Sequence, residues 1–131
     1  MRSNLRKVSL SGGDVPESPA EPILPESIQT QLRKGVLELC VLTLLSRGDA
    51  YGYEIAAKLM ADVGMGEGTI YPLMRRMQDD GLVSTYLVEV AGSPPRKYYR
   101  MTDVGHQTRD RQRGEWKTFI AQVETMLGEE P

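Results

Sequence analysis

Residues 67–81 read EGTIYPLMRRMQDDG, and this stretch decides the fold because it predicts one amphipathic helix, over residues 67–80, that stops at Gly81. At 100° per residue, one face collects the large apolar side chains of Ile70, Leu73, Met74 and Met77. The other face holds Gly68, Pro72, Arg75 and Asp79, with Tyr71 and Arg76 on the flanks. The exposed face is therefore small near its start and cationic further along.

The segments on both sides of this helix predict a winged helix-turn-helix domain. A helix expected over residues 50–60 is followed by a glycine-containing turn at 63–66. Downstream, a strand over 82–90, a proline-containing turn over 91–95 and a returning strand over 96–101 predict a hairpin. Two short helices and a hairpin in this order are typical of a winged helix. The expected fold class is mainly α with a small β-wing.

The first and last helices predict a dimer. The helix expected over residues 31–47 is apolar on two opposite stripes, Leu32, Val36, Leu39 and Cys40 on one and Leu37, Val41, Leu44 and Leu45 on the other. So small a domain can seldom bury both stripes against its own chain, so one stripe is expected to face a second copy. The last helix, capped by Thr102 and expected to run to residue 127, would be roughly 39 Å long. Its second half carries an apolar seam: Trp116, Phe119, Ile120, Val123, Met126 and Leu127.

These elements predict four parts of the chain. Residues 1–29, rich in Pro and Ser, are expected to form a disordered tail, which is interpreted either as a solvated leader without a specific role or as a partner-binding arm. Residues 30–101 are the winged helix-turn-helix domain, residues 102–127 the long C-terminal dimerisation helix, and residues 128–131 a short tail.

Charge is distributed unevenly along the chain. The formal net charge of −2 excludes a protein that holds nucleic acid by overall charge alone. Residues 91–100, however, contain Arg96, Lys97 and Arg100 and no acid. The wing is therefore the local basic patch at which we expect phosphate to bind.

The residue types suit the reading of DNA. Small residues at the start of the third helix, Gly68 among them, let its backbone approach a groove, and Arg75 points outward, where a guanidinium can pair with a guanine edge. Arg76 on the flank is better placed for phosphate, and Ser93 at the wing tip can donate to one. Outward arginines are also common as solvated charges, and cations protect strand edges. A winged-helix adaptor that binds an acidic protein partner is the alternative to a DNA-binding protein.

At these residues the sequence resembles the PadR-type transcriptional regulators. The resemblance rests on four stretches in the family's order, which are AYGYEI at 50–55, EGTIYPLMRRM at 67–77, DGLV at 80–83 and PRKYYRMT at 95–102, followed by Gly105. It covers residues 32–127 and implies a dimeric winged-helix repressor of the family's short subtype. In such a repressor the last helix packs with the partner's first, and double-stranded DNA with a near-palindromic operator is the ligand.

The resemblance also implies roles for individual residues. Tyr51, Thr69 and Tyr71 match hydroxyl residues near the DNA backbone, and Arg75 matches the groove-facing helix. Arg96 and Lys97 match the wing, while Gly68 and Pro72 belong to the same DNA-facing surface. Two departures stand out. Gly66 replaces a polar cap, and Pro72 requires either a helix that begins near Thr69 or a kink.

Trp116 is the only Trp and lies on the apolar seam with Phe119, Ile120 and Val123. It is interpreted either as an interface anchor or as a ring that stacks on a planar or phenolic effector, as in some multidrug-sensing members of the family.

The sequence lacks the residue patterns that enzymes and metal-binding proteins require. Cys40 lies in an apolar stripe, His106 has no partner for catalysis, and no Cys or His cluster suggests a metal site. No enzyme activity, metal or cofactor is expected. The longest apolar stretch, residues 36–45, is too short to span a bilayer, and with one Cys and no signal-peptide pattern the expected location is the cytoplasm.

Overall fold

The computed structural model describes residues 27–128 of the 131-residue chain. The chain falls into two units, Met1–Gln31 and Leu32–Pro131, and the arrangement below is that of the second unit. Residues 1–26 of the predicted disordered tail and residues 129–131 of the predicted C-terminal tail lie outside the described residues.

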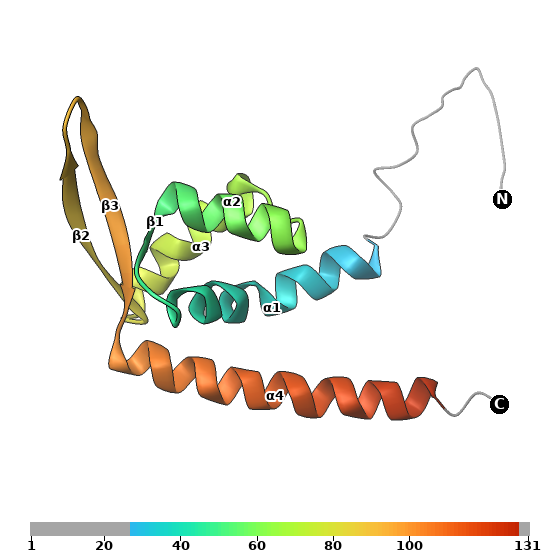
Figure 1. The fold of residues 1–131 in the computed structure, drawn as a ribbon. Helices are drawn as coiled ribbons and strands as arrows, with labels where there is room; N and C mark the ends of the chain where they lie inside the picture. The colour runs from blue at the N-terminus through green and yellow to red at the C-terminus, as the bar shows by residue number, and fades with distance from the viewer. Residues whose placement is uncertain (1–26, 129–131) are drawn as a thin grey trace, which may run out of the picture. The chain divides into compact units, whose positions relative to one another are not determined.

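Helices dominate the described chain, as the sequence predicts. In order, the elements are α1 (Ile28–Leu45), β1 (Ala50–Tyr51), α2 (Gly52–Val63), α3 (Glu67–Asp79), β2 (Val83–Val90), β3 (Ser93–Met101) and α4 (Asp103–Leu127) (Figure 1). The expected fold class, mainly α with a small β-wing, is confirmed. Helix α1 begins three residues before its predicted start, because the Ser27 hydroxyl accepts a hydrogen bond from the Thr30 amide at 3.1 Å and caps the helix.

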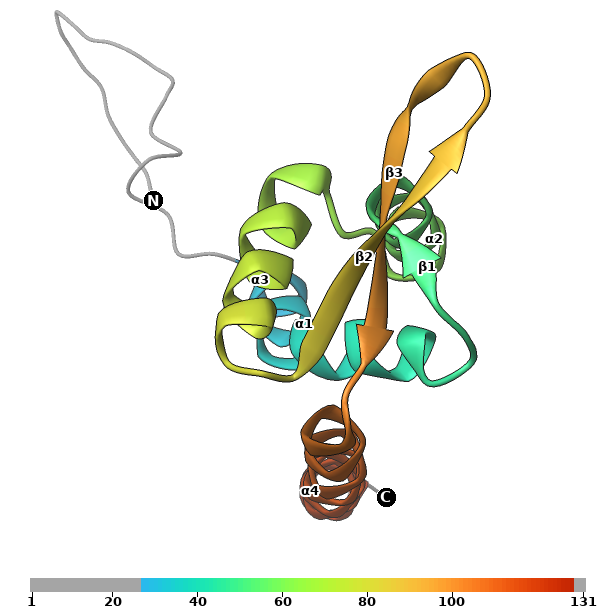
Figure 2. The same cartoon turned by 90° about the vertical axis from the view of Figure 1, so that its left-hand side faces the viewer.

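The sheet contains a strand that the sequence analysis missed. Its order is β1-β3-β2, all antiparallel. The two-residue strand β1 pairs with the edge of β3 that faces away from β2 (Figure 2). Residues 50–51 were predicted to open the second helix, and they form β1 because they pair with Tyr98 and Tyr99 on β3. Such a pairing between segments far apart in sequence leaves no local pattern.

The tip of the wing is tighter than predicted. The expected turn over residues 91–95 is wrong, because only Ala91 and Gly92 form it, with Gly92 in the left-handed region at φ 75°, and β3 begins at Ser93. Pro94 and Pro95 fall where the register with β2 shifts, between the pairs Val88–Arg96 and Val90–Ser93. A proline is tolerated there because a bulge requires no ladder donor from it.

The core lies between α1, α2, α3 and the inner face of the sheet. All four residues predicted for the inner face of α3 are buried, and Ile55, Ala56 and Leu59 cover them from α2. From α1 the buried side chains are Leu37, Val41, Leu42 and Leu45. This packing leaves the opposite face of α3 exposed to solvent.

A joint of close contacts connects the α3–β2 turn to the start of α4. The Thr102 hydroxyl donates to the Gly81 carbonyl at 2.6 Å and accepts from the Gly105 amide at 3.0 Å, which makes Thr102 the predicted cap. The Thr102 amide donates to the Leu82 carbonyl at 3.1 Å. A Cβ at Gly105 would collide with that carbonyl oxygen and lie 2.7 Å from Met101 Cγ, so this position requires glycine.

Beyond the joint, α4 is little buried. Its buried residues are Gly105 and Thr108, both near its start. Of the two α1 stripes, one of which was predicted to face a second copy, the stripe of Leu32, Val36, Leu39 and Cys40 is only partly covered, with Leu32 at 43% exposure and the other three half-buried. Within residues 27–128, no helix has both the length and the hydropathy needed to cross a membrane.

Candidate nucleic-acid interface

The outer face of α3 carries the residues that the sequence predicts for DNA contact. Gly68, Thr69, Pro72 and Arg75 are all exposed, and a Cβ built on Gly68 would meet nothing within 4 Å. Gly66 caps the helix N-terminus without a side-chain hydrogen bond to the first amides of α3. A second backbone can therefore approach the first turn of α3 without a steric obstacle.

Pro72 lies inside α3, which begins at Glu67 rather than near Thr69. Its missing amide hydrogen leaves the Gly68 carbonyl, four residues earlier, without its helical donor. Gly68 is exposed, so solvent or a ligand can satisfy that carbonyl. The cost of an internal proline is reduced because the freed acceptor is not buried.

Tyr71 connects α3 to the start of α2. A Cβ at Gly52 would lie 3.1 Å from Tyr71 Cε1, so the glycine lets the ring lie against the backbone of α2. Burial raises the pKa of Tyr71 above its ordinary value, and the Glu67 carboxylate raises it further. The phenol is neutral at physiological pH and can donate a hydrogen bond.

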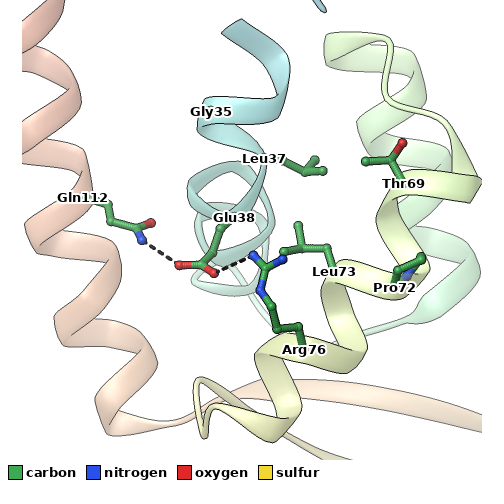
Figure 3. Close-up of a pocket in the computed structure, with 8 residues that line it drawn as sticks. All are labelled: Gly35, Leu37, Glu38, Thr69, Pro72, Leu73, Arg76 and Gln112. Atoms are coloured by element: carbon green, nitrogen blue, oxygen red, sulfur yellow. Dashed lines mark hydrogen bonds and ion pairs between the residues drawn. The ribbon is translucent and has the colours of Figure 1, made fainter. Parts of the chain in front are cut away.

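The two arginines of α3 have different surroundings. Both are exposed, but Arg76 Nη2 lies 3.5 Å from the Glu38 carboxylate on α1, whose other oxygen accepts a hydrogen bond from Gln112 Nε2 on α4 at 2.6 Å (Figure 3). These residues line a cleft of about 480 Å³ between α1, α3 and α4. Arg75 makes no ion pair within the described residues. Arg76, predicted to contact phosphate, thus has an acidic partner on α1 that no local pattern in the sequence indicates.

Aromatic rings hold the wing cations. The guanidinium of Arg96 lies 4.5 Å from the centre of the Tyr51 ring, and Lys97 Nζ lies 5.5 Å from that of Tyr99. Ser93 is exposed at the tip, as predicted. Neither Arg96 nor Lys97 has an acidic partner in the described part of the chain, so both retain their charge for an external anion.

Arg100, the third wing cation, is neutralised. Its Nε donates to Asp49 Oδ2 at 3.1 Å, and the same oxygen accepts the Tyr86 hydroxyl at 2.6 Å. That hydrogen bond to Asp49 raises the pKa of Tyr86. The basic patch of residues 91–100 thus contains two free cations and one that is paired within the fold.

The residues predicted for the dimer seam or effector pocket lie together on one side of α4. Trp116, Ile120 and Val123 are half-buried, and Phe119 at the edge of the stripe is 55% exposed. In the described residues, no group of three or more His, Cys, Asp or Glu side chains is arranged to hold a metal ion.

Three residues that the sequence analysis did not select help to build this surface: Glu38, Asp49 and Gln112. Each is a polar side chain on an element remote in sequence from the cation or carboxylate it contacts. The one available signal was Glu38, a charge within the apolar stretch of α1.

The chain is similar to a known protein family and to several solved structures. The model of the transcriptional regulator PadR-like family matches residues 41–111. The structure of a PadR-like transcriptional regulator from Bacillus cereus is 37% identical, with a TM-score of 0.67, covering 74% of this chain and 96% of that one. A PadR family regulator from Eggerthella lenta is 36% identical, with a TM-score of 0.69, covering 76% and 88%.

A third similarity is to the negative transcriptional regulator PadR of Bacillus subtilis. It is 30% identical over 77 residues, which are 55% of this chain and 42% of that protein. Its structure in complex with operator DNA is 26% identical, with a TM-score of 0.55, covering 59% of this chain and 45% of that chain. The present chain thus matches less than half of the Bacillus subtilis protein.

Proposed function

Since the chain belongs to the PadR-like family of transcriptional regulators, we propose that it is a homodimeric repressor that binds a near-palindromic operator in double-stranded DNA. In this proposal the outer face of α3 enters the major groove and Arg75 reads a base edge. Tyr51, Thr69 and Tyr71 contact the backbone beside it, and Ser93, Arg96 and Lys97 of the wing bind flanking phosphates. The Bacillus subtilis relative bound to operator DNA supports this class of ligand.

The observation that carries the proposal is the state of the surface cations. Arg75, Arg96 and Lys97 are exposed and have no acidic partner among residues 27–128, although the protein as a whole is slightly acidic. Arg75 shares the exposed face of α3 with Gly68, where no side chain blocks close approach. Uncompensated cations beside an unobstructed helix face favour a polyanion with a groove over an acidic protein partner.

The dimer is supported by the surface that one copy leaves uncovered. The seam of α4, with Phe119 55%, Met126 76% and Leu127 66% exposed, is apolar beyond the last buried residue, Thr108. The partly exposed α1 stripe offers a matching apolar surface on a second copy. Two copies joined through these faces would hold two α3 helices at a fixed separation, as a symmetric operator requires.

Release of DNA is assigned to the same seam. A planar effector that stacks on Trp116 would change the packing of α4 and hence the spacing of the two α3 helices. Quenching of Trp116 fluorescence by planar cationic dyes tests this step, and an unchanged spectrum at saturating dye would assign Trp116 to packing alone.

The decisive experiment is enrichment of bound fragments from the source genome at a stated salt concentration, together with light scattering of the free protein. A single near-palindromic motif and a dimer mass are expected. Enrichment without a motif, accompanied by recovery of a stable acidic protein partner, would contradict DNA recognition, and a monomer at micromolar concentration would contradict the dimer.

A further inference from the structure

A row of tyrosines crosses the outer face of the sheet at the root of the wing. Tyr98 on β3 is the register partner of both Tyr51 on β1 and Tyr86 on β2, so the three side chains point to the same face. The Tyr98 ring centre lies 5.5 Å from that of Tyr51 and 5.7 Å from that of Tyr86. Tyr98 is therefore the middle ring of the row.

Two arginines flank Tyr98 on its own strand. Arg96 and Arg100 are two residues before and after it, which places them on the same face of β3. Each guanidinium lies over the ring on a neighbouring strand, Arg96 over Tyr51 at 4.5 Å and Arg100 over Tyr86 at 4.9 Å. Both of these rings lie against the ring of Tyr98, and Tyr51 also stacks on Tyr53.

The two arginines differ in what holds them. Arg100 is fixed by Asp49, an acid that cancels its charge. Arg96 is held by a ring, and a ring orients a guanidinium through its quadrupole while leaving its full charge available. Arg100 therefore stabilises the row of tyrosines, whereas Arg96 is a positioned cation that still attracts an anion.

We propose that Tyr98 is the positioning residue of the wing: its ring keeps Tyr51 in place as the seat of Arg96, which thereby presents its guanidinium to a DNA phosphate. The inference rests on the proposed function for its ligand. The role belongs to the ring, because the Tyr98 ring lies against two others and its hydroxyl makes no hydrogen bond within the described residues, whereas the hydroxyl of Tyr86 donates to Asp49.

The test compares Tyr98→Ile, which keeps a good strand former but removes the ring, with the matched control Tyr98→Phe, which keeps it. DNA affinity is measured as a function of salt for both variants, for Arg96→Gln and for the double variant Tyr98→Ile/Arg96→Gln. Tyr98→Ile should weaken binding roughly two- to fivefold per wing. It should also make the salt dependence shallower, by up to about 0.9 per wing.

Tyr98→Phe should behave as the wild type, and the double variant should bind no more weakly than Arg96→Gln alone. Losses that add in the double variant, or a Tyr98→Phe protein as weak as Tyr98→Ile, would overturn the proposal. So would a folded Tyr98→Ile protein with wild-type affinity and salt dependence.

If Tyr98→Ile does not fold, a measurement on the free wild-type protein tests the position of Arg96 directly. By NMR, the side-chain protons of Arg96 should be shifted upfield by the Tyr51 ring current, whereas those of Arg75 should not be. The absence of that shift would overturn the positioning role without reference to DNA. An intact shift in a protein that binds no DNA sequence would instead mean that the proposed function is wrong.

Discussion

Helix α3 and the wing each carry a cation that the fold holds in place, but they hold it by different means. Arg76 on α3 is held by the Glu38 carboxylate at 3.5 Å, and Arg96 on the wing by the face of the Tyr51 ring at 4.5 Å. An acid-held cation must give up its partner before it binds phosphate, whereas a ring-held cation need not. In the proposed complex the wing is thus ready to bind phosphate, while the contribution of Arg76 depends on α1 and, through Gln112, on α4.

Both regions depend on the same joint, so the largest expected effect comes from disturbing it. In Gly105→Ala the new Cβ would collide with the Leu82 carbonyl at the turn between α3 and β2. We expect the free energy of unfolding to fall by about 1–3 kcal/mol, measured by urea denaturation at a fixed protein concentration. Wing and α3 contacts should weaken together, because their shared support moves.

Gly114→Ala is the matched control for that change. Gly114 lies in the exposed middle of α4, and a Cβ there would meet nothing within 4 Å. This variant should gain up to about 1 kcal/mol in stability from helix propensity. A Gly105→Ala protein as stable as the wild type would show that the joint tolerates a methyl group and does not link the two regions.

The next effect separates base reading from phosphate binding. Arg75→Ala should cost about 1–3 kcal/mol per half-site in binding to the selected operator and leave affinity for random DNA nearly unchanged, because a guanidinium–guanine pair is lost in each half-site. Competition titrations with both DNAs measure the difference. Arg111→Ala, which removes the same charge from an exposed position on α4, is the control. Equal losses on both DNAs would assign Arg75 to phosphate.

Local patterns in the sequence predict most of this architecture. The apolar spacing in residues 67–80 gives the buried face of α3 correctly, because a helix repeats its contacts every three or four residues and the same residues must face the core. The cap at Thr102 follows from a side chain close to the backbone amide that it serves, and the hairpin from two strand-forming stretches joined by a short turn. Such features need no knowledge of distant segments.

The features that sequence reasoning missed all depend on distant partners. Strand β1 exists because residues 50–51 meet β3, and the pairing of Arg76 with Glu38 joins residues 38 positions apart. The division of the wing cations into two free and one neutralised depends on Asp49, which lies 51 positions from Arg100. Composition identifies the basic patch, but only the fold determines which of its charges are already compensated.

That division predicts a smaller effect within the wing. Lys97→Ala should reduce affinity for all DNA sequences alike and lower the salt slope by about one unit per wing, because its charge is free to neutralise a phosphate. Arg100→Gln should change the slope less, because Asp49 already balances Arg100. Equal slope changes in the two variants would contradict the distinction between free and neutralised cations.

The smallest effect is expected where the acid-held cation is released. Glu38→Gln removes the charge that holds Arg76 but retains an amide that can still hydrogen-bond Gln112 on α4. Because Arg76 is 62% exposed and Glu38 23% exposed, the lost ion pair is worth only about 0.2–1 kcal/mol, so operator affinity should rise by at most roughly fivefold per protomer. The salt dependence should become steeper as Arg76 gains a phosphate.

Asp62→Asn, which breaks the exposed Lys58–Asp62 pair on α2 with the same change in charge, is the control. If Glu38→Gln weakens binding while thermal stability is preserved, then Glu38 orients Arg76 for DNA instead of competing with it, and the acid and the ring play the same part in the two regions.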